Sequence, residues 1–281
     1  MSSEEQNKKS SIKEIIFKEK LSDLFRKIFK KGKFAFQTNN FLSGFSLFDN
    51  EEENIDRNLI CNIDPRSVIV EQYRNLRNQI LSGNRDKKNK VLAVTSSVRG
   101  EGKTTIAGNL AISFATNPEV SVIIIDGDMR SPSMHKIFGI SRESGLSEFI
   151  NGDIEFEDSL KETFSDNIKI ISAGEKASNP SELLSFPRMV KLIEDLRRDD
   201  NVNYVIIDTP PVIPATDPRV IAELADATIF VAKANHTSKE LIAHSLSLLG
   251  KSCILGVVLN NMIGLSSYYP YYYPDVYGYG D

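Results

Sequence analysis

The sequence predicts an α/β fold with a mostly parallel central β-sheet and helices on both faces. Short apolar, β-branched runs alternate with helical segments at the spacing of consecutive βαβ units, and each run is apolar on both of its faces. Strands of that kind lie inside parallel sheets that helices cover. The runs are VLAVTS (91–96), VSVIIID (120–126), IKIIS (168–172), NYVIID (203–208), ATIFVA (227–232) and ILGVVLN (254–260).

The composition is that of an ordinary water-soluble globular protein. Of the 281 residues, 41% are hydrophobic and 26% are charged, and the net charge of −4 gives no basic field for nucleic acid. No apolar run approaches the ~20 residues that cross a bilayer, and the N-terminus lacks the order of a secretory signal. The two cysteines and three histidines form no metal-ligand spacing and no disulfide framework. We expect a cytoplasmic, reduced location and no nucleic-acid partner.

The chain divides into three regions. Residues 1–60 are an extension, residues 61–265 carry the α/β pattern, and residues 266–281 form a tail for which we expect disorder. Residues 17–31 place apolar side chains at i, i+3, i+4 and i+7 opposite basic ones, which predicts a basic amphipathic helix. Such a helix suits an anionic membrane surface, and docking on its own domain or on a partner is the alternative. The rest of the extension is interpreted as linker.

The tail is unusually rich in tyrosine. Seven of the nine tyrosines of the chain lie in it. A stretch with so many copies of one reactive side chain is either an accident of repeat expansion or a substrate. The seven are Tyr268, Tyr269, Tyr271, Tyr272, Tyr273, Tyr277 and Tyr279.

A phosphate-binding loop follows the first apolar run. The sequence GEGKTT stands between a predicted strand and a predicted helix, which is the context that such a loop requires. Its glycines let backbone N–H groups face phosphates, its lysine places a cation on the β- and γ-phosphates, and its first threonine is a ligand for Mg²⁺. The fold is therefore expected to be P-loop NTPase-like. The residues predicted to contact the nucleotide here are Gly100, Glu101, Gly102, Lys103, Thr104 and Thr105.

Two further strands end in acids. Asp126 and Asp128 follow VIII, and Asp208 follows YVII. Because active sites of such sheets lie at the carboxyl ends of the strands, these carboxylates are expected to converge on the loop. There they could hold Mg²⁺ or take a proton from a nucleophile. Any one of them could instead be a helix cap, but three at one loop favour phosphoryl transfer or nucleotide hydrolysis.

These motifs resemble those of the bacterial tyrosine kinases of capsule and exopolysaccharide synthesis, within the deviant-Walker ATPases. The likeness spans roughly residues 64 to 281 and rests on GEGKTT as Walker A, IIIDGDMR as Walker A′, VIIDTPP as Walker B and the tyrosine-rich tail. Arg130 is the distinguishing member of the second motif. GLSEFING, NPSELL, Thr216-Asp217 and LGVVLNN are also similar to the family. The HRD and DFG signatures of eukaryotic kinases are missing from the sequence.

The resemblance implies ATP and Mg²⁺ as the bound species and roles for the acids and the lysine. Lys103 would stabilise charge on the transferred phosphoryl group, and Thr104 would bind Mg²⁺ together with Asp128 and Asp208. Asp126 or Asp128 would orient or deprotonate the incoming tyrosine hydroxyl, and the sequence does not divide these tasks. The implied catalytic set is Lys103, Asp126, Asp128, Arg130 and Asp208.

Two more assignments follow from the resemblance. Asn260 or Asn261 would read the adenine edge, with a solvated loop asparagine as the alternative. In EQYRNLR, Glu71, Arg74 and Arg77 fit a motif that builds ring-shaped oligomers in relatives. On a helix these three could bridge to a neighbouring subunit. The alternative is an intrahelical ion pair worth about 0.3–0.5 kcal/mol.

The resemblance also implies a function and partners. The chain would autophosphorylate its tail in trans within a ring-shaped homo-oligomer, and accumulated phosphate charge would loosen the ring. It would regulate capsule or exopolysaccharide synthesis or export. Implied partners are a transmembrane adaptor of the chain-length-determinant type and a cytoplasmic tyrosine phosphatase. The expected location is the inner face of the plasma membrane, where the chain would be peripheral.

Three rival interpretations stay open. A partitioning or positioning ATPase of the same fold would carry a signature lysine where this chain has Val98. An iron–sulfur carrier ATPase would need a CxxC pair, which the sequence lacks. An ATP-binding scaffold without kinase activity would not need the catalytic acids that this chain retains.

Overall fold

The computed structural model of this chain describes residues 35–37, 55–83, 90–175, 177, 179–250 and 252–261. The amphipathic segment 17–31 and the tyrosine-rich tail 266–281 lie outside the described residues. The predictions made for these two segments therefore stay predictions.

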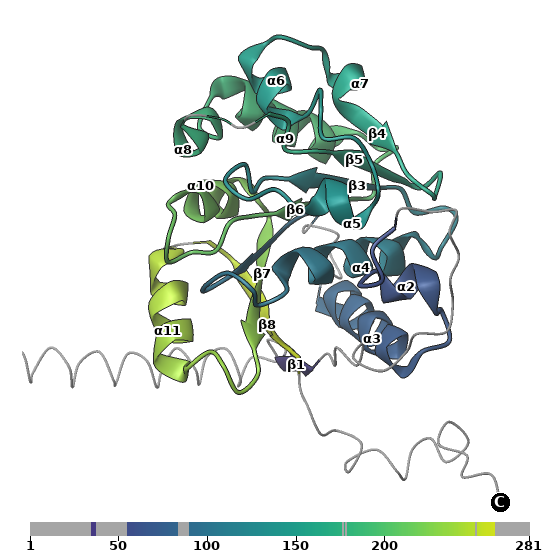
Figure 1. Cartoon of the computed structure of the whole chain (residues 1–281), viewed down its shortest axis with the longest axis vertical. Helices are drawn as coiled ribbons and strands as arrows, with labels where there is room; N and C mark the ends of the chain where they lie inside the picture. The colour runs from purple at the N-terminus through teal and green to yellow at the C-terminus, as the bar shows by residue number, and fades with distance from the viewer. Residues whose placement is uncertain are drawn as a thin grey trace, which may run out of the picture.

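The described residues form one eight-stranded sheet in the order β1-β8-β7-β2-β6-β3-β5-β4 (Figure 1). All neighbouring strands pair in parallel except β4 and β5. The predicted α/β fold with a mostly parallel sheet is confirmed. The strands are β1 (Ala35–Gln37), β2 (Val91–Ser96), β3 (Val122–Asp126), β4 (Leu160–Glu162), β5 (Ile168–Ile171), β6 (Tyr204–Asp208), β7 (Ala227–Lys233) and β8 (Ile254–Asn260).

Two strands were not predicted. β4 is a three-residue strand that pairs antiparallel with β5 at one edge of the sheet. β1 lies at the other edge and pairs in parallel with β8, in the register Phe36 to Val258. The interpretation of everything between residue 31 and residue 60 as linker is therefore wrong at residues 35–37.

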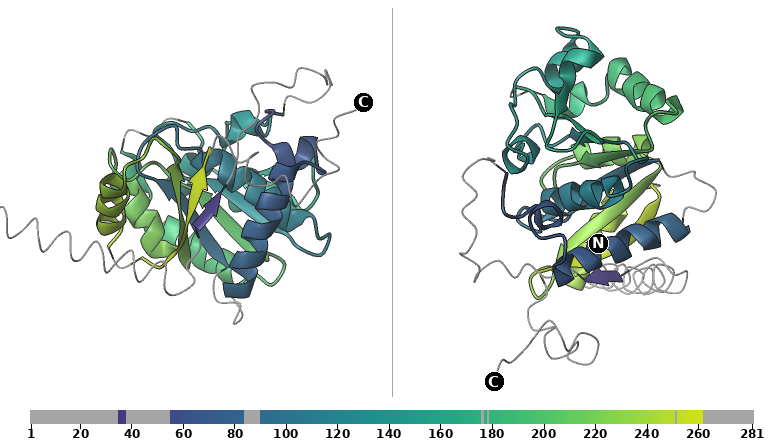
Figure 2. Two further views of the ribbon diagram at one scale, coloured as in Figure 1. Left: turned by 90° about the horizontal axis from the view of Figure 1, so that it is seen from below. Right: turned by 90° about the vertical axis from the view of Figure 1, so that its right-hand side faces the viewer.

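Helices cover both faces of the sheet, as Figures 1 and 2 show. One core cluster joins α2 to α5 with one face, and two others join α6 and α8 to α11 with the opposite face. The helices are α2 (Ile60–Ile63), α3 (Val68–Gly83), α4 (Lys103–Ala115), α5 (Met134–Ile137), α6 (Leu146–Asn151), α7 (Phe156–Ser159), α8 (Pro180–Leu183), α9 (Pro187–Arg198), α10 (Asp217–Leu224) and α11 (Lys239–Leu248). In the part of the chain that is described, none of these helices could span a bilayer.

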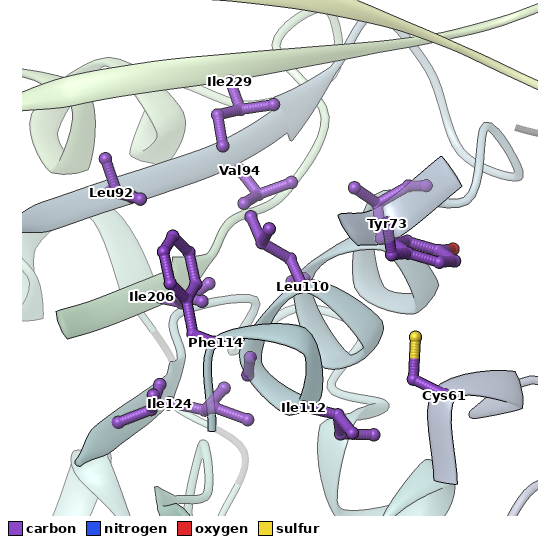
Figure 3. Close-up of a cluster of buried hydrophobic side chains, with 14 of the residues drawn as sticks. Cys61, Tyr73, Leu92, Val94, Leu110, Ile112, Phe114, Ile124, Ile206 and Ile229 are labelled. Atoms are coloured by element: carbon purple, nitrogen blue, oxygen red, sulfur yellow. The ribbon is translucent and has the colours of Figure 1, made fainter. Parts of the chain in front are cut away.

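Helix α4 is buried along most of its length. Every residue from Ile106 to Phe114 is buried, because the sheet lies on one side of the helix and α2 and α3 lie on the other. Figure 3 shows Leu110 and Phe114 between the strands and the layer formed by Tyr73 and Cys61. Burying each such side chain contributes roughly 1.5–3 kcal/mol. The helix that begins at the predicted phosphate-binding loop is thus held rigidly.

The segment before α2 is anchored to α4. Leu59 is fully buried, and the side chain of Asn109 accepts from Cys61 N (2.9 Å) and donates to Asn58 O (2.7 Å). The same amide donates to Thr105 O at 2.9 Å. The packed unit therefore extends to the N-terminal side of residue 61, where we placed the boundary.

Candidate nucleotide site

The loop GEGKTT runs from the carboxyl end of the central strand β2 into α4. Gly100 and Gly102 have φ angles of +80° and +90°, a region that L-residues with a side chain rarely adopt. A Cβ on Gly102 would overlap Nδ2 of Asn260, whereas the space around Gly100 is open. The two glycines are thus required for different reasons, one for backbone conformation alone and one for close packing as well.

Lys103 lies between two carboxylates. Its Nζ is 3.0 Å from Oδ2 of Asp128 and 3.5 Å from Oδ2 of Asp208, and it donates to Oγ1 of Thr104 at 3.3 Å. Burial alone would lower the pKa of this amine, but Asp208 and Asp128 outweigh that effect and hold the pKa above its usual value. Lys103 is therefore a permanent cation at the centre of the site.

Thr104 and Asp208 form a second link between the loop and the sheet. The Thr104 hydroxyl donates to Oδ2 of Asp208 at 2.6 Å, and the Ser133 hydroxyl donates to Oγ1 of Thr104 at 3.2 Å. Asp208 is fully buried, and its Oδ1 has no hydrogen-bond partner among the described residues. Burial raises the pKa of Asp208, against the opposing charge of Lys103. A buried carboxylate oxygen without a partner is costly unless a ligand supplies one.

Asp126 is held by backbone N–H groups. Its Oδ2 accepts from Ser133 N (3.2 Å) and Met134 N (3.0 Å), and its Oδ1 accepts from Asp128 N (3.2 Å). Burial, and after it the neighbouring Asp208, raises the pKa of Asp126 to about 7. Asp126 is fully buried, whereas Asp128 lines a surface pocket. Only the second of these acids can reach a molecule that enters from solvent.

The oxygen atoms at this point fit Mg²⁺. Thr104 and Asp208 are already in contact, and Asp128 lies on the other side of Lys103. The unpartnered Oδ1 of Asp208 is an available ligand atom, and hydroxyl and carboxylate oxygens are the ligands that Mg²⁺ prefers. No group of three or more His, Cys, Asp and Glu side chains in the described residues is arranged to hold a metal by itself. When bound, Mg²⁺ usually keeps waters and nucleotide phosphates as its remaining ligands.

Arg130 and Asp217 form an ion pair near the lysine cluster. Arg130 donates to both oxygens of Asp217, at 2.6 Å and 3.1 Å, and to Oγ of Ser181 at 3.2 Å. Asp217 is fully buried at the start of α10, so this bidentate pair ties the residues after β3 to that helix. Asp217 belongs to the Thr216-Asp217 motif, but its pairing with Arg130 was not predicted.

Glu101 and Asn260 brace the loop from inside. Glu101 is 1% exposed and accepts from Val98 N at 2.8 Å and from the Thr237 hydroxyl. Asn260, at the end of β8, donates to Glu101 O at 2.9 Å and accepts from Asn261 N at 2.8 Å. In this arrangement both side chains hold the loop itself. A nucleotide-binding role for Glu101 and an adenine-reading role for Asn260 stay predictions. Thr105, also predicted to contact the nucleotide, contributes its carbonyl to the Asn109 link described above.

The three residues of the predicted oligomer motif on α3 separate into two groups. Arg74 forms an ion pair with Glu71 one turn away and donates to Pro65 O at 3.1 Å. Arg77 instead donates to Ser113 O at 2.6 Å and Thr116 Oγ1 at 2.7 Å, at the C-terminal end of α4. A cation at that end is favourable because the last helical carbonyls are unpaired. In the described chain, only Glu71 and Arg74 are left on the helix surface as an exposed pair.

A surface pocket of about 340 Å³ adjoins Asp128. It lies between the start of the loop, the residues after β3, the residues after β6 and the start of α8. Its wall combines apolar residues with two arginines and one aspartate. The lining residues are Arg99, Asp128, Met129, Arg130, Ala177, Pro180, Pro210, Pro211, Pro214 and Ala215.

Comparison with known proteins agrees with this geometry. Residues 87–269 match the ParA family, described as NUBPL iron-transfer P-loop NTPases. The putative tyrosine-protein kinase CapB of Staphylococcus aureus is 35% identical over 212 residues, which are 74% of this chain and 92% of that protein. The structure of the kinase domain of Escherichia coli tyrosine kinase Etk is similar over 82% of this chain and 89% of that domain (27% identity, TM-score 0.75).

A second solved structure, the chimerical protein CapA2B2, covers 84% of this chain and 98% of its own, with 29% identity and a TM-score of 0.72. The two cysteines of this chain are far apart in sequence and do not form the CxxC pair that an iron–sulfur carrier would need. Of these two, Cys61 is buried and Cys253 is exposed. The P-loop NTPase fold itself binds nucleotides.

Proposed function

Because this chain belongs to the bacterial tyrosine-protein kinases, we propose that it transfers the γ-phosphoryl group of ATP to tyrosines of its own C-terminal tail. The observation that carries the proposal is the contact of Lys103 with two strand-end carboxylates beside an open pocket. A nucleotide phosphate on the loop would lie next to that pocket. The chemistry of phosphoryl transfer is mostly positioning and charge stabilisation, which this arrangement provides.

Each residue has a task in that reaction. Lys103 stabilises the negative charge that builds up on the transferred phosphoryl group and on ADP as it leaves. Thr104, Asp208 and Asp128 would hold Mg²⁺, which would neutralise phosphate charge when bound. Asp128 orients the tyrosine hydroxyl and accepts its proton as the phenol oxygen forms the new P–O bond and the β–γ bridge breaks. The burial of Asp126 favours Asp128 for this step and leaves Asp126 to fix the residues after β3.

We further propose the partners that the family resemblance implies. They are a homo-oligomeric ring through Glu71 and Arg74, a transmembrane adaptor, a tyrosine phosphatase and an anionic membrane surface met by residues 17–31. The chain would then act peripherally at the membrane in capsule or exopolysaccharide synthesis. Arg77 would support the ring indirectly, because its guanidinium is bonded to α4.

The proposed function is tested by incubation with γ-labelled ATP and Mg²⁺, followed by phosphoamino-acid analysis. The wild-type chain should yield phosphotyrosine, and Lys103→Met should lose at least about 100-fold of it. Substituting the seven tail tyrosines by Phe should remove most of the label while leaving ATP affinity unchanged. Release of free phosphate without phosphotyrosine would favour the positioning-type ATPase, and neither product would favour the scaffold.

A further inference from the structure

The pocket beside Asp128 has a lining that suits an aromatic ring with a polar tip. Seven of its ten lining residues are Pro, Ala or Met, and its volume of about 340 Å³ is at the small end of ligand pockets. Rigid proline rings offer an apolar wall to a phenol at little entropic cost, and the phenol oxygen would find Asp128 at the inner end. Ile213, next to Pro214 in the chain, is also apolar and is 39% exposed.

The two arginines of this pocket differ in their charge balance. Arg130 is neutralised by the bidentate pair with Asp217. Arg99 is exposed, and no carboxylate among the described residues pairs with it. Lys103, the next nearest cation along the loop, is already matched by two acids. Arg99 is therefore the one lining cation with an unmatched charge in the described structure.

The tail has the complementary charge. Residues 266–281 contain no Lys, Arg or His, and their acids are Asp275 and Asp281. Side chains two residues apart in an extended segment point to the same side, about 7 Å apart. With the phenol of Tyr277 in the pocket, Asp275 would lie on the same side of the chain at the rim. Tyr273 has the same spacing from Asp275 in the other direction.

We propose that Arg99 selects, in the tail of a second copy, those tyrosines that lie two residues from an anion. This inference rests on the proposed function and assigns its acceptor specificity. Tyr273 and Tyr277 would be phosphorylated first, because Asp275 supplies the anion. Each new phosphate, with charge near −2, then supplies the anion for tyrosines two residues away, such as Tyr279 after Tyr277 and Tyr271 after Tyr273. The order of phosphorylation follows from one cation and the sequence of the tail.

The test uses the full chain with its seven tail tyrosines changed to Phe as the enzyme, so that an added peptide is the only tail acceptor. The peptides are residues 266–281, the same peptide with Asp275→Asn, and one phosphorylated at Tyr277. The enzyme is compared with versions that also carry Arg99→Gln, Arg99→Lys or, as a matched exposed control, Arg198→Gln. Initial rates, KM for ATP and the modified positions by mass spectrometry are measured.

We expect Asp275→Asn and Arg99→Gln each to lower kcat/KM for the peptide about two- to five-fold, as an exposed charge pair allows. Together they should lower it no further than either alone, because they remove the same contact. Arg99→Gln should lower the rate of phosphorylation of Tyr279 in the phosphorylated peptide by about ten-fold, and Arg99→Lys should recover part of that rate. KM for ATP should not change with Arg99→Gln, and Arg198→Gln should have no effect.

Three results would overturn the inference, and the first two concern the peptide. One is effects of the two substitutions that multiply, and the other is initial phosphorylation of tyrosines remote from Asp275. A rise in KM for ATP equal to that for peptide would also overturn it by assigning Arg99 to the nucleotide. If ATP is hydrolysed but no peptide is labelled, the kinase proposal itself fails. Binding of the fluorescein-labelled peptide, with and without Arg99→Gln, then still decides whether Arg99 holds the tail.

Discussion

The nucleotide site and the outer face of α3 both carry charged motifs, but they use charge in opposite ways. At the nucleotide site Lys103, Asp128 and Asp208 come from distant parts of the chain and are nearly or fully buried. On α3, Glu71 and Arg74 are one turn apart, and more than a third of each side chain is exposed. Charges in the first set cannot be changed without leaving a buried partner unpaired, whereas the second pair is screened by water.

This difference shows that the two motifs depend on their surroundings in different ways. The buried set is organised before any ligand binds, because three elements of the fold fix it. The ion pair on α3 contributes little to the stability of a single chain, because water screens it. Its interaction energy would increase only if another surface excluded water from it. Arg77 belongs by sequence to the second motif but by contact to the first region, since it holds the far end of the helix that begins at Lys103. The following substitutions test this division.

Asp208→Asn should have the largest effect. It keeps the shape of the side chain but removes the charge that faces Lys103 and Thr104, so kinase activity should fall at least about 100-fold. Asp153→Asn, in an exposed loop, is the matched control and should be fully active. Retention of most activity by Asp208→Asn would show that the buried cluster does not carry the chemistry.

Arg77→Ala should lower the free energy of unfolding by about 1–3 kcal/mol, because it removes charged hydrogen bonds to Ser113 O and Thr116 Oγ1. Chemical denaturation of the monomeric chain measures this change. A loss of oligomer with unchanged stability would instead place Arg77 with Glu71 and Arg74.

Asp126→Asn should change the pH dependence of stability in metal-free buffer. A carboxyl whose pKa rises from 3.8 unfolded to about 7 folded stabilises the fold at low pH, and that stabilisation is lost as pH rises through 7. The melting temperature of the variant relative to wild type should therefore increase between pH 5 and pH 8. Asp195→Asn, exposed on α9, should show a constant difference over that range. A flat difference for Asp126→Asn would mean that Asp126 is ionised throughout.

Arg74→Ala should have the smallest effect on a single chain, below about 0.5 kcal/mol, because the ion pair with Glu71 and the hydrogen bond to Pro65 O that it removes are both exposed to water. Its effect should appear in sedimentation, as a loss of the larger species. Equal losses in the free energy of unfolding for Arg74→Ala and Arg77→Ala would contradict the distinction between the two regions.

Most of the fold could be predicted because its strands are continuous apolar runs. All six predicted strands are present, and the P-loop NTPase-like sheet and the kinase family are confirmed by the relatives. β4 was missed because Leu160–Glu162 is only three residues long and has no apolar pattern. β1 was missed for a similar reason, since three residues in a polar segment carry too little signal.

The residues of the candidate site could be predicted where they lie in a local sequence motif. Lys103, Thr104 and the three aspartates do meet, because the carboxyl ends of parallel strands share one edge. Contacts between distant residues left no local signal. Examples are the pair of Arg130 with Asp217, the backbone donors of Ser133 and Met134, and the brace from Asn260 to Glu101. Nothing in the sequence pairs Arg130 with Asp217, because the two residues are 87 positions apart.

The edge strand β1 has a practical consequence for anyone who shortens this chain. A fragment that starts at residue 61, where the composition changes, would discard Leu59 from the core and uncover the backbone of β8. Open strand edges recruit other strands and promote aggregation. β8 ends at Asn260, whose side chain donates to Glu101 O in the glycine-rich loop. We therefore expect the same truncation to weaken phosphate binding by that loop. A fragment that begins upstream of Ala35 keeps both.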